Sequence, residues 1–299
     1  MLHPLVSVLI VSYNQVSFIR DAIESAATQD YENLEIIVAD DGSTDGTVEI
    51  ILECQKQYPG KLVALVGATN LGITGNSNRG LRACRGKYVA FMGGDDSFLP
   101  GKILAQVRWL EADLNRVLCY HDLDVYDSAS NLTLYLWSER YIFRHGSART
   151  VIRYGTFFGA TSVMVRYPKG LLFNPNISTA SDWLMWIEVL ERQSGTLGHV
   201  DGVYARYRRH ANNVTSTGKH HLADLLATIE AVNLLVPRKY HWERTQKLAE
   251  IYFLAAYRSF RAKEIANCLS LLSQSFRACK GFWISPVVLL FRKILKKKL

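Results

Sequence analysis

The sequence predicts an α/β fold in which a mostly parallel sheet is flanked by helices and followed by a helical C-terminal extension. Over the first hundred residues, short β-branched runs alternate with helical patterns. The runs are apolar throughout, as expected for parallel strands that are covered on both faces. Beyond residue 219, apolar side chains recur at the three- and four-residue spacing of a helix, at Leu222, Leu225, Leu226 and Ile229.

The elements are expected in a regular order along the chain. Strands are predicted at Val6–Val11, Glu35–Ala39, Lys61–Val66 and Tyr88–Met92. The helices between and after them are predicted at Gln15–Gln29, Thr44–Tyr58, Gly75–Arg85 and Gly101–Asp113. A looser pattern then gives strands near Val117–His121, Ser162–Val165 and Gly198–Tyr204, and a helix near Asp182–Gln193. We therefore expect one domain over residues 1–219, with halves at 1–98 and 99–219, and a basic helical extension over 220–299.

The positive charge of the chain is concentrated at its C-terminal end. The 299 residues carry a net charge of +8, but residues 1–219 hold 21 basic and 22 acidic side chains, a net of −1. Residues 220–299 hold 14 basic and 5 acidic side chains, a net of +9, and no acidic residue follows Arg277. A near-neutral body argues against nucleic acid as the main ligand, although the basic tail leaves nucleic-acid binding open as an alternative.

Cysteine usage and the N-terminus bear on the compartment. The five cysteines are odd in number and form no C-x-x-C pair, which argues against a disulfide framework or a zinc site and indicates a reducing, cytoplasmic environment. The first residues lack the charged region of a signal peptide, and no stretch approaches the roughly 20 apolar residues of a membrane-spanning helix.

Polar side chains follow each of the four N-terminal strands. The segments are Ser12-Tyr13-Asn14, Asp40-Asp41, Asn70-Leu71-Gly72 and Asp95-Asp96. Because ligands of open α/β sheets bind beyond the carboxyl ends of the strands, we expect one polar rim with four carboxylates. No G-x-x-x-x-G-K-S/T or G-x-G-x-x-G motif is present, so a glycine cradle for phosphates is excluded.

The Asp95-Asp96 pair suits a hard cation. Adjacent carboxylates repel each other by on the order of 1 kcal/mol even in water, and Mg²⁺ or Mn²⁺ binds one or two carboxylates together with substrate phosphates. A solvated turn is the alternative interpretation, because Gly93-Gly94-Asp95-Asp96-Ser97 also has turn composition.

Three further candidates have structural alternatives. Asp41 is placed to accept an N–H from a base edge such as that of uracil, whereas Thr44 and Asp45 suit the start of the next helix. Asp182 is a candidate general base, or a first-turn acid that stabilises its helix. His210, in the basic segment Arg206–His210, is a candidate metal ligand or an exposed loop histidine.

The order and spacing of these motifs resemble the signature of glycosyltransferase family 2. The matching segments are Val6–Asn14, Asp40–Thr47, Asn70-x-Gly72 and Asp95-Asp96-x-x-x-Pro100, within a likeness over about residues 5–215. The resemblance implies a GT-A fold, which is a Rossmann-like, mostly parallel sheet with flanking helices. It also implies a nucleoside-diphosphate-sugar donor and inversion at the anomeric carbon.

The resemblance further implies roles for individual residues. Tyr13 and Asp41 look like uracil contacts, Asp96 resembles the metal ligand, and Asp182 is similar to the catalytic base. The segment Tyr207–Asn213 resembles the loop that closes on the donor diphosphate, with His210 as a further metal ligand. The implied cofactor is Mn²⁺ or Mg²⁺, and the implied nucleotide site comprises Ser12, Tyr13, Asn14, Asp40, Asp41, Asn70, Gly72, Asp95 and Arg208.

The chain departs from the family pattern at three places. Gly94 stands where many relatives have a third aspartate, and Asn76-Ser77-Asn78 stands where many have Ala-Arg-Asn. Ser181 replaces the glutamate that often precedes the catalytic aspartate.

The predicted function is that of an inverting, metal-dependent glycosyltransferase of the hexosyltransferase type. The enzyme is expected to move a sugar from a UDP-sugar to a glycan acceptor linked to polyprenyl diphosphate, in bacterial cell-surface polysaccharide synthesis such as O-antigen or capsule. Aromatic and apolar residues followed by lysines predict that residues 277–299 contact the anionic inner face of the cell membrane. A solvated helix, or one packed on the domain, is the alternative for this tail.

Two other functions remain open. A catalytically weak or inactive GT-A-like protein that binds a sugar or a partner would keep the fold without the chemistry. A sugar-nucleotide nucleotidyltransferase would normally carry a glycine-rich, lysine-bearing loop after the first strand, where this chain has Ser12-Tyr13-Asn14-Gln15.

Overall fold

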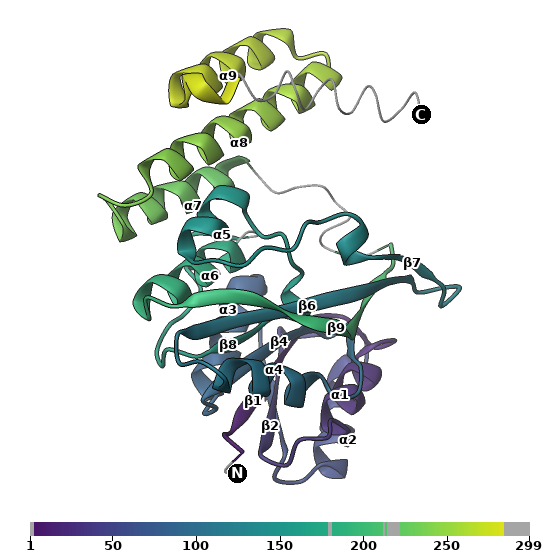
Figure 1. Ribbon diagram of the computed structural model, residues 1–299. Coiled ribbons are helices and arrows are strands. Elements are labelled where there is room, and N and C mark those ends of the chain that lie inside the picture. Colours follow the sequence, from purple (N-terminus) through teal and green to yellow (C-terminus); the bar gives the residue numbers. More distant parts are fainter. Residues whose placement is uncertain (1–2, 179–180, 212, 214–221, 284–299) are drawn as a thin grey trace.

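The computed structural model describes residues 3–178, 181–211, 213 and 222–283. In this part of the chain a mixed sheet lies between two layers of helices, and a stack of C-terminal helices covers one end of the molecule (Figure 1).

The N-terminal half of the sheet is parallel. Its strands lie in the order β3-β2-β1-β4 and have the bounds Val6–Ser12 (β1), Leu34–Asp40 (β2), Leu62–Val66 (β3) and Tyr88–Gly93 (β4). Ser12 pairs with Asp40 across β1 and β2, and Val11 pairs with Gly93 across β1 and β4. The carboxyl ends of these three strands therefore meet at one edge, as the sequence predicts.

Helices cover both faces of this half. Successive residues of a strand point to opposite faces, so Ile10 packs with Ile23 and Ile51 on one side, and Leu9 packs with Leu81 on the other. The helices are α1 (Ile19–Ala27), α2 (Thr47–Gln57), α3 (Gly72–Ala83) and α4 (Lys102–Glu111). The continuous burial of β1 and β2 explains why these strands are apolar throughout.

The second half of the sheet is mixed. Beyond β4 the order is β8-β6-β9-β5, with β7 paired to β6, and only the β6–β9 pair is parallel in this half. The bounds are Ser97–Phe98 (β5), Arg116–Asp127 (β6), Thr133–Leu136 (β7), Met164–Arg166 (β8) and Thr196–Arg209 (β9). The β6–β9 register is irregular: Asp122 pairs with Val203 and Leu123 pairs with Ala205, so Tyr204 is an extra residue in β9.

The remaining helices form the C-terminal stack and the layer beneath it. They are α5 (Ala148–Tyr154), α6 (Ser181–Arg192), α7 (Leu222–Leu235), α8 (His241–Arg261) and α9 (Ile265–Ala278), with short 3₁₀ turns at Trp137–Glu139 (η1), Ala160–Ser162 (η2) and Lys280–Trp283 (η4). Ion pairs from Arg149 to Glu243 and from Arg153 to Glu250 fasten α8 to α5. Among the described residues, no helix is long and apolar enough to cross a membrane.

The predicted elements are present, but two helices begin later than the sequence suggests. Helix α1 begins at Ile19 rather than Gln15. Residues 16–18 form a turn before it, and the N–H groups of Gln15 and Val16 donate to Thr47 Oγ1 (2.8 Å) and Asp45 Oδ2 (3.1 Å). Helix α2 begins at Thr47 rather than Thr44, after Gly46 with a φ of 97°. The expected capping by Thr44 is therefore wrong, whereas Asp45 does accept from the first turn, at Thr47.

Candidate active site

A cleft of about 940 Å³ opens at the carboxyl ends of the parallel strands and extends to the C-terminal helices. It brings together most of the residues that the sequence singles out, namely Ser12, Tyr13, Asn14, Asp41, Asp95, Asp96, Asp182 and His210. Asp40, Asn70, Gly72 and Arg208 are outside the described lining of this cleft.

The two aspartates that follow β2 have different surroundings. Asp40 is fully buried, and its carboxylate accepts from the N–H (2.8 Å) and the hydroxyl (2.6 Å) of Ser43. It therefore shapes the loop. Asp41 lines the cleft, and its Oδ1 accepts from the N–H of Leu71 at 2.8 Å, which ties the end of β2 to the start of α3.

The loop after β1 is held open towards the cleft. Asn14 has a left-handed φ of 51°, and its side-chain oxygen accepts from the N–H of Thr44 at 2.9 Å. Its own N–H donates to Ser43 Oγ at 2.8 Å. These bonds leave the ring of Tyr13 47% exposed at the cleft, as a stacking partner for a flat ligand would be.

Asn70 and Gly72 shape the start of α3. The side-chain oxygen of Asn70 accepts from the N–H of Gly72 at 2.9 Å, and Gly72 has a φ of 75° that other residues rarely adopt. The next residue, Ile73, lines the cleft. The Asn-x-Gly motif thus positions this helix at the cleft.

The replaced Ala-Arg-Asn motif leaves an amide at the cleft and an arginine behind it. Asn76 lines the cleft and donates to the carbonyl of Ala39 at 2.8 Å. The guanidinium of Arg79 donates to the carbonyl of Asp40 and to Asn76 Oδ1. Arg79 is therefore engaged with the end of β2 rather than directed into the cleft.

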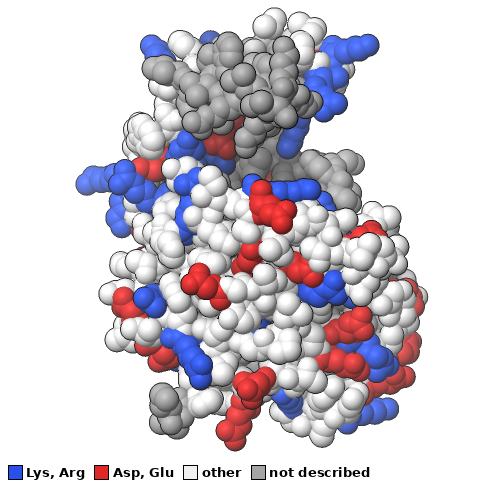
Figure 2. Space-filling model, turned by 45° about the vertical axis from the view of Figure 1, so that its right-hand side comes forward, with Lys and Arg blue, Asp and Glu red and all other residues white. Residues whose placement is uncertain are grey.

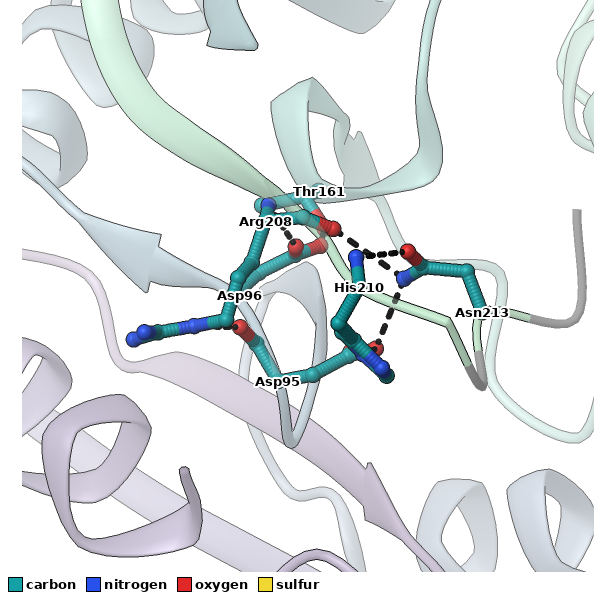
Figure 3. Close-up of polar contacts among 6 residues, drawn as sticks. All are labelled: Asp95, Asp96, Thr161, Arg208, His210 and Asn213. Carbon is teal, nitrogen blue, oxygen red and sulfur yellow. Dashed lines mark hydrogen bonds and ion pairs between the residues drawn. The ribbon is translucent and has the colours of Figure 1, made fainter. Parts of the chain in front are cut away.

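The acidic pair after β4 is divided between two environments (Figure 3). The Asp96 side chain is buried and accepts from the hydroxyl of Thr161 and from the N–H of Arg208 at 3.0 Å. The Asp95 carboxylate instead lies 3.0 Å from Nε2 of His210 and accepts from Asn213 Nδ2 at 3.3 Å. His210 therefore pairs with Asp95, and not with Asp96, which is the partner expected in a shared metal site.

The predicted diphosphate-binding arginine lies behind this group. Arg208 donates to the Asp95 carbonyl at 2.8 Å and pairs with Asp21 at 3.1 Å, so its side chain points away from His210 and Asn213 (Figure 3). The next residue, Arg209, lines the cleft, and so does Tyr207. The spacing of the motif could not indicate which of the two arginines faces the ligand.

The group has the donor chemistry of a divalent cation site. Burial and, after it, the neighbouring Asp95 carboxylate raise the pKa of Asp96 well above its ordinary value. No cluster of three or more His, Cys, Asp or Glu side chains suited to a metal lies within the described residues. Asp95, Asp96 and His210 thus fit Mg²⁺ or Mn²⁺ only as a site completed by ligand phosphates, which is the usual arrangement for Mg²⁺.

Asp182 reaches the cleft from the first turn of α6. Its Oδ1 accepts from the N–H of Trp183 at 2.8 Å, and the Trp183 indole donates to the carbonyl of Val151 at 2.9 Å. The buried indole fixes the start of this helix. The position of Asp182 is therefore compatible with both interpretations: it is an acid in the first turn of its helix, and its side chain lines the cleft.

The cleft also has parts that lie outside the sequence motifs. Trp137 and Tyr141 stack with ring centroids 4.5 Å apart and line one side of it. Residues of α7 and α8 line another part, although the sequence assigned this region to a separate extension. The contribution of α7 and α8 joins segments that are far apart in the chain, so no local spacing indicates it.

Comparison with known proteins places the chain in a family. The sequence profile described as "Glycosyl transferase family 2" matches residues 7–168, which is more than half of the chain. The chain belongs to glycosyl transferase family 2. An uncharacterized glycosyltransferase of Haemophilus influenzae is 30% identical to this family 2 protein over 241 residues, 77% of this chain and 73% of the relative.

Other relatives are longer than this family 2 protein. An uncharacterized protein of Mycobacterium tuberculosis is 31% identical over 212 residues, which cover 70% of this chain and 60% of the relative. The chain thus spans less than two thirds of that relative's length.

Solved structures agree in fold. Staphylococcus aureus TarS 1–349 in complex with UDP-GlcNAc superposes with a TM-score of 0.67 at 16% identity, over 92% of this chain and 81% of that chain. The mannosyltransferase PcManGT from Pyrobaculum calidifontis, in complex with GDP-Man and Mn²⁺, gives 0.52 at 15% identity, over 98% and 80%. The family 2 protein has the GT-A fold, as the resemblance implied, and a helical C-terminal region, as the apolar spacing beyond residue 219 predicted.

Proposed function

We propose that the chain is an inverting glycosyltransferase that moves a sugar from a UDP-sugar to a hydroxyl of a glycan acceptor linked to polyprenyl diphosphate. Residues 1–219 would form the catalytic domain, with a nucleotide-binding half at 1–98 and an acceptor half at 99–219, and residues 220–299 its helical extension. The reaction would serve bacterial cell-surface polysaccharide synthesis, such as that of O-antigen or capsule.

One observation carries this proposal: the polar ends of β1, β2 and β4 and the first turn of α6 line the same cleft. Tyr13 and Asp41 supply a flat ring and a carboxylate for a base, and Asp95 and His210 form a polar group beside them. Asp182 supplies a carboxylate from a separate element. Family membership and the solved GT-A neighbours in complex with UDP-GlcNAc or GDP-Man support a nucleotide-sugar donor.

The chemistry needs one base and one stabilised leaving group. Asp182 takes the proton of the acceptor hydroxyl as its oxygen bonds to the anomeric carbon, while the bond from that carbon to the donor phosphate breaks and UDP leaves. Asp95, Asp96 and His210, together with the donor phosphates, would hold a Mn²⁺ or Mg²⁺ ion, which would supply Lewis acidity toward the diphosphate. Arg209 lines the cleft and adds positive charge near the leaving group.

Binding of UDP in the presence of Mn²⁺ tests the proposal, measured by isothermal titration calorimetry with GDP as the comparison. A screen of UDP release over donor sugars then identifies the transferred sugar. We expect UDP to bind and the chelator EDTA to weaken its binding. Absence of UDP binding would favour a non-catalytic relative, and release of diphosphate from UTP and a sugar phosphate would favour a nucleotidyltransferase.

We also propose that the enzyme is peripheral on the cytoplasmic face of the cell membrane, through residues 277–299. Helix α9 carries Ile265, Leu269 and Phe276, each about half exposed or more, on one face. Basic side chains lie on both flanks of the upper, helical end of the molecule in Figure 2. Arg277, at the end of α9, and Lys280, in η4, are exposed. The basic residues of 284–299 lie outside the described residues. Each basic residue near an anionic surface adds about 1 kcal/mol.

Co-sedimentation with vesicles of anionic and neutral phospholipid tests this location. The truncation is made after Trp283, because Phe282 is buried and packs near Phe253. We expect the full chain to pellet with anionic vesicles and the chain lacking residues 284–299 to pellet less. Equal pelleting of both chains would contradict a role for this tail.

A further inference from the structure

Helices α7 and α8 form the part of the cleft farthest along the chain from the strand ends. The described lining from these helices comprises Leu222, Leu225, Lys247, Glu250, Ile251, Leu254, Ala255 and Arg258. None of these residues belongs to the motifs of the donor site, and the matched family profile ends at residue 168. This part of the cleft is therefore a feature of the chain's own C-terminal helices.

The wall that these helices provide is mainly apolar. Leu225 of α7 and Ile251, Leu254 and Ala255 of α8 line it, and Leu254 is 47% exposed. An exposed leucine inside a cleft leaves apolar surface that a ligand can cover. Burial of such surface favours binding, so this wall suits an apolar chain.

Cations outnumber acids along the same wall. Glu250 forms two ion pairs, one with Lys247 Nζ at 3.0 Å and one with Arg153 at 3.1 Å. Arg258 is exposed and lines the cleft, and its guanidinium makes no hydrogen bond or ion pair with any residue that the structure describes. The wall therefore carries an excess of positive charge with one arginine available to an anion.

The apolar and cationic wall borders the proposed catalytic base. Lys247 Nζ lies 5.7 Å from the centre of the Trp183 ring, and Trp183 follows Asp182 in the first turn of α6. Tyr154, like Lys247, lines the cleft. The wall is therefore continuous with the part of the cleft that Asp182 lines.

We propose that the wall formed by α7 and α8 binds the phosphate and the first part of the apolar chain of a lipid-linked acceptor, with Arg258 as the phosphate contact and Leu254 as the chain contact. This inference rests on the proposed function, which supplies the acceptor hydroxyl near Asp182. It adds helices α7 and α8 to the acceptor half that is proposed at residues 99–219.

Titration calorimetry with farnesyl phosphate tests the proposal, with UDP and Mg²⁺ present in excess so that the donor site is filled. We expect farnesyl phosphate to bind, and inorganic phosphate and farnesol each to bind at least about tenfold more weakly, because each lacks one half of the recognition. Arg258→Gln and Leu254→Gln should each weaken farnesyl phosphate binding about tenfold and leave the affinity for UDP unchanged.

Arg261→Gln is the matched control. Arg261 is an exposed arginine three residues further along α8, outside the described cleft lining, and its loss should not change the affinity. Equal effects of Arg258→Gln and Arg261→Gln would overturn the proposal, and so would equally tight binding of inorganic and farnesyl phosphate. Failure of UDP to bind counts against the proposed function instead, and the farnesyl phosphate titration is then run without UDP.

Discussion

Nε2 of His210 lies 3.0 Å from Oδ2 of Asp95, although the two residues are 115 positions apart in the chain. The same oxygen accepts from Asn213 Nδ2, whose side-chain oxygen in turn accepts from the N–H of His210 at 2.6 Å. The end of β4 is thereby joined to the segment after β9. Because Asp95 and His210 both line the cleft, we expect a ligand bound at this point to contact both segments.

Replacement of His210 should weaken nucleotide binding. We expect His210→Ala to lower the affinity for UDP in Mn²⁺ about tenfold, because the site loses one of its few candidate metal donors. His241→Ala, at an exposed histidine at the start of α8, is the control and should bind UDP normally. Calorimetry with and without Mn²⁺ measures both, and an unchanged affinity in His210→Ala would remove this histidine from the metal site.

Replacement of Asp182 should separate catalysis from binding. A positioned general base contributes about 10²- to 10⁴-fold, so Asp182→Asn should reduce sugar transfer by that order and leave UDP affinity nearly intact. The control is Asp201→Asn, since the side chain of Asp201 is fully exposed on β9. UDP-release rates and UDP calorimetry are compared for the two variants. Loss of UDP binding in Asp182→Asn would contradict its assignment as the base.

Lys102 should make stability depend on pH. It is fully buried in α4, with its Nζ donating to Gln106 and lying 4.5 Å from the centre of the Phe98 ring, and burial lowers its pKa from 10.5 to about 7. Between pH 7 and 10.5 the unfolded chain keeps a proton that the folded chain has released. The contribution of Lys102 to the free energy of unfolding therefore rises with pH there, by up to about 1.4 kcal/mol per unit.

Lys102→Met removes this contribution. The gain in stability over the natural chain should be largest at pH 7 or below and should shrink as the pH approaches 10, measured by urea unfolding at several pH values. Lys263→Met, at an exposed lysine, is the control. A difference between Lys102→Met and the natural chain that does not change with pH would disprove the titration of Lys102 in this range.

Trp186 should dominate the core between the sheet and α6. Its side chain is almost fully buried, and its ring meets Phe91 edge to face with centroids 5.0 Å apart. Trp186→Ala should therefore lower the free energy of unfolding by about 3–5 kcal/mol. Trp242→Ala, at a tryptophan that is 58% exposed, should change it by about 0.5 kcal/mol or less. Denaturant unfolding compares them, and similar losses would contradict the importance of this contact.

Much of the donor side of the cleft could be predicted from sequence. Apolar runs locate the parallel strands because these strands are buried on both faces, and parallel strands necessarily bring their carboxyl ends to one edge. The clustering of Ser12, Tyr13, Asp41 and Asp95 follows from that topology. Local composition and general rules are sufficient for this part of the molecule.

The orientation of side chains at the rim could not be predicted in the same way. Asp40 turns to Ser43 and Asp41 to the cleft, although the two are adjacent and chemically identical. Asp96 is held by Thr161, 65 residues away, and Asp45 and Thr47 accept from the N–H groups of Val16 and Gln15 in the turn before α1. Each outcome depends on a contact between distant segments, which spacing along the chain does not encode.

The extra residue at Tyr204 in β9 determines which arginine reaches the cleft. Side chains alternate along a strand, so Tyr207 and Arg209 share one face and Arg208 takes the other. A shift of one residue exchanges the two faces. Deleting a single position upstream of Tyr207 would thus turn Arg208 towards the cleft without altering the motif, so in this chain the length of β9 decides the facing of residues whose identity stays the same.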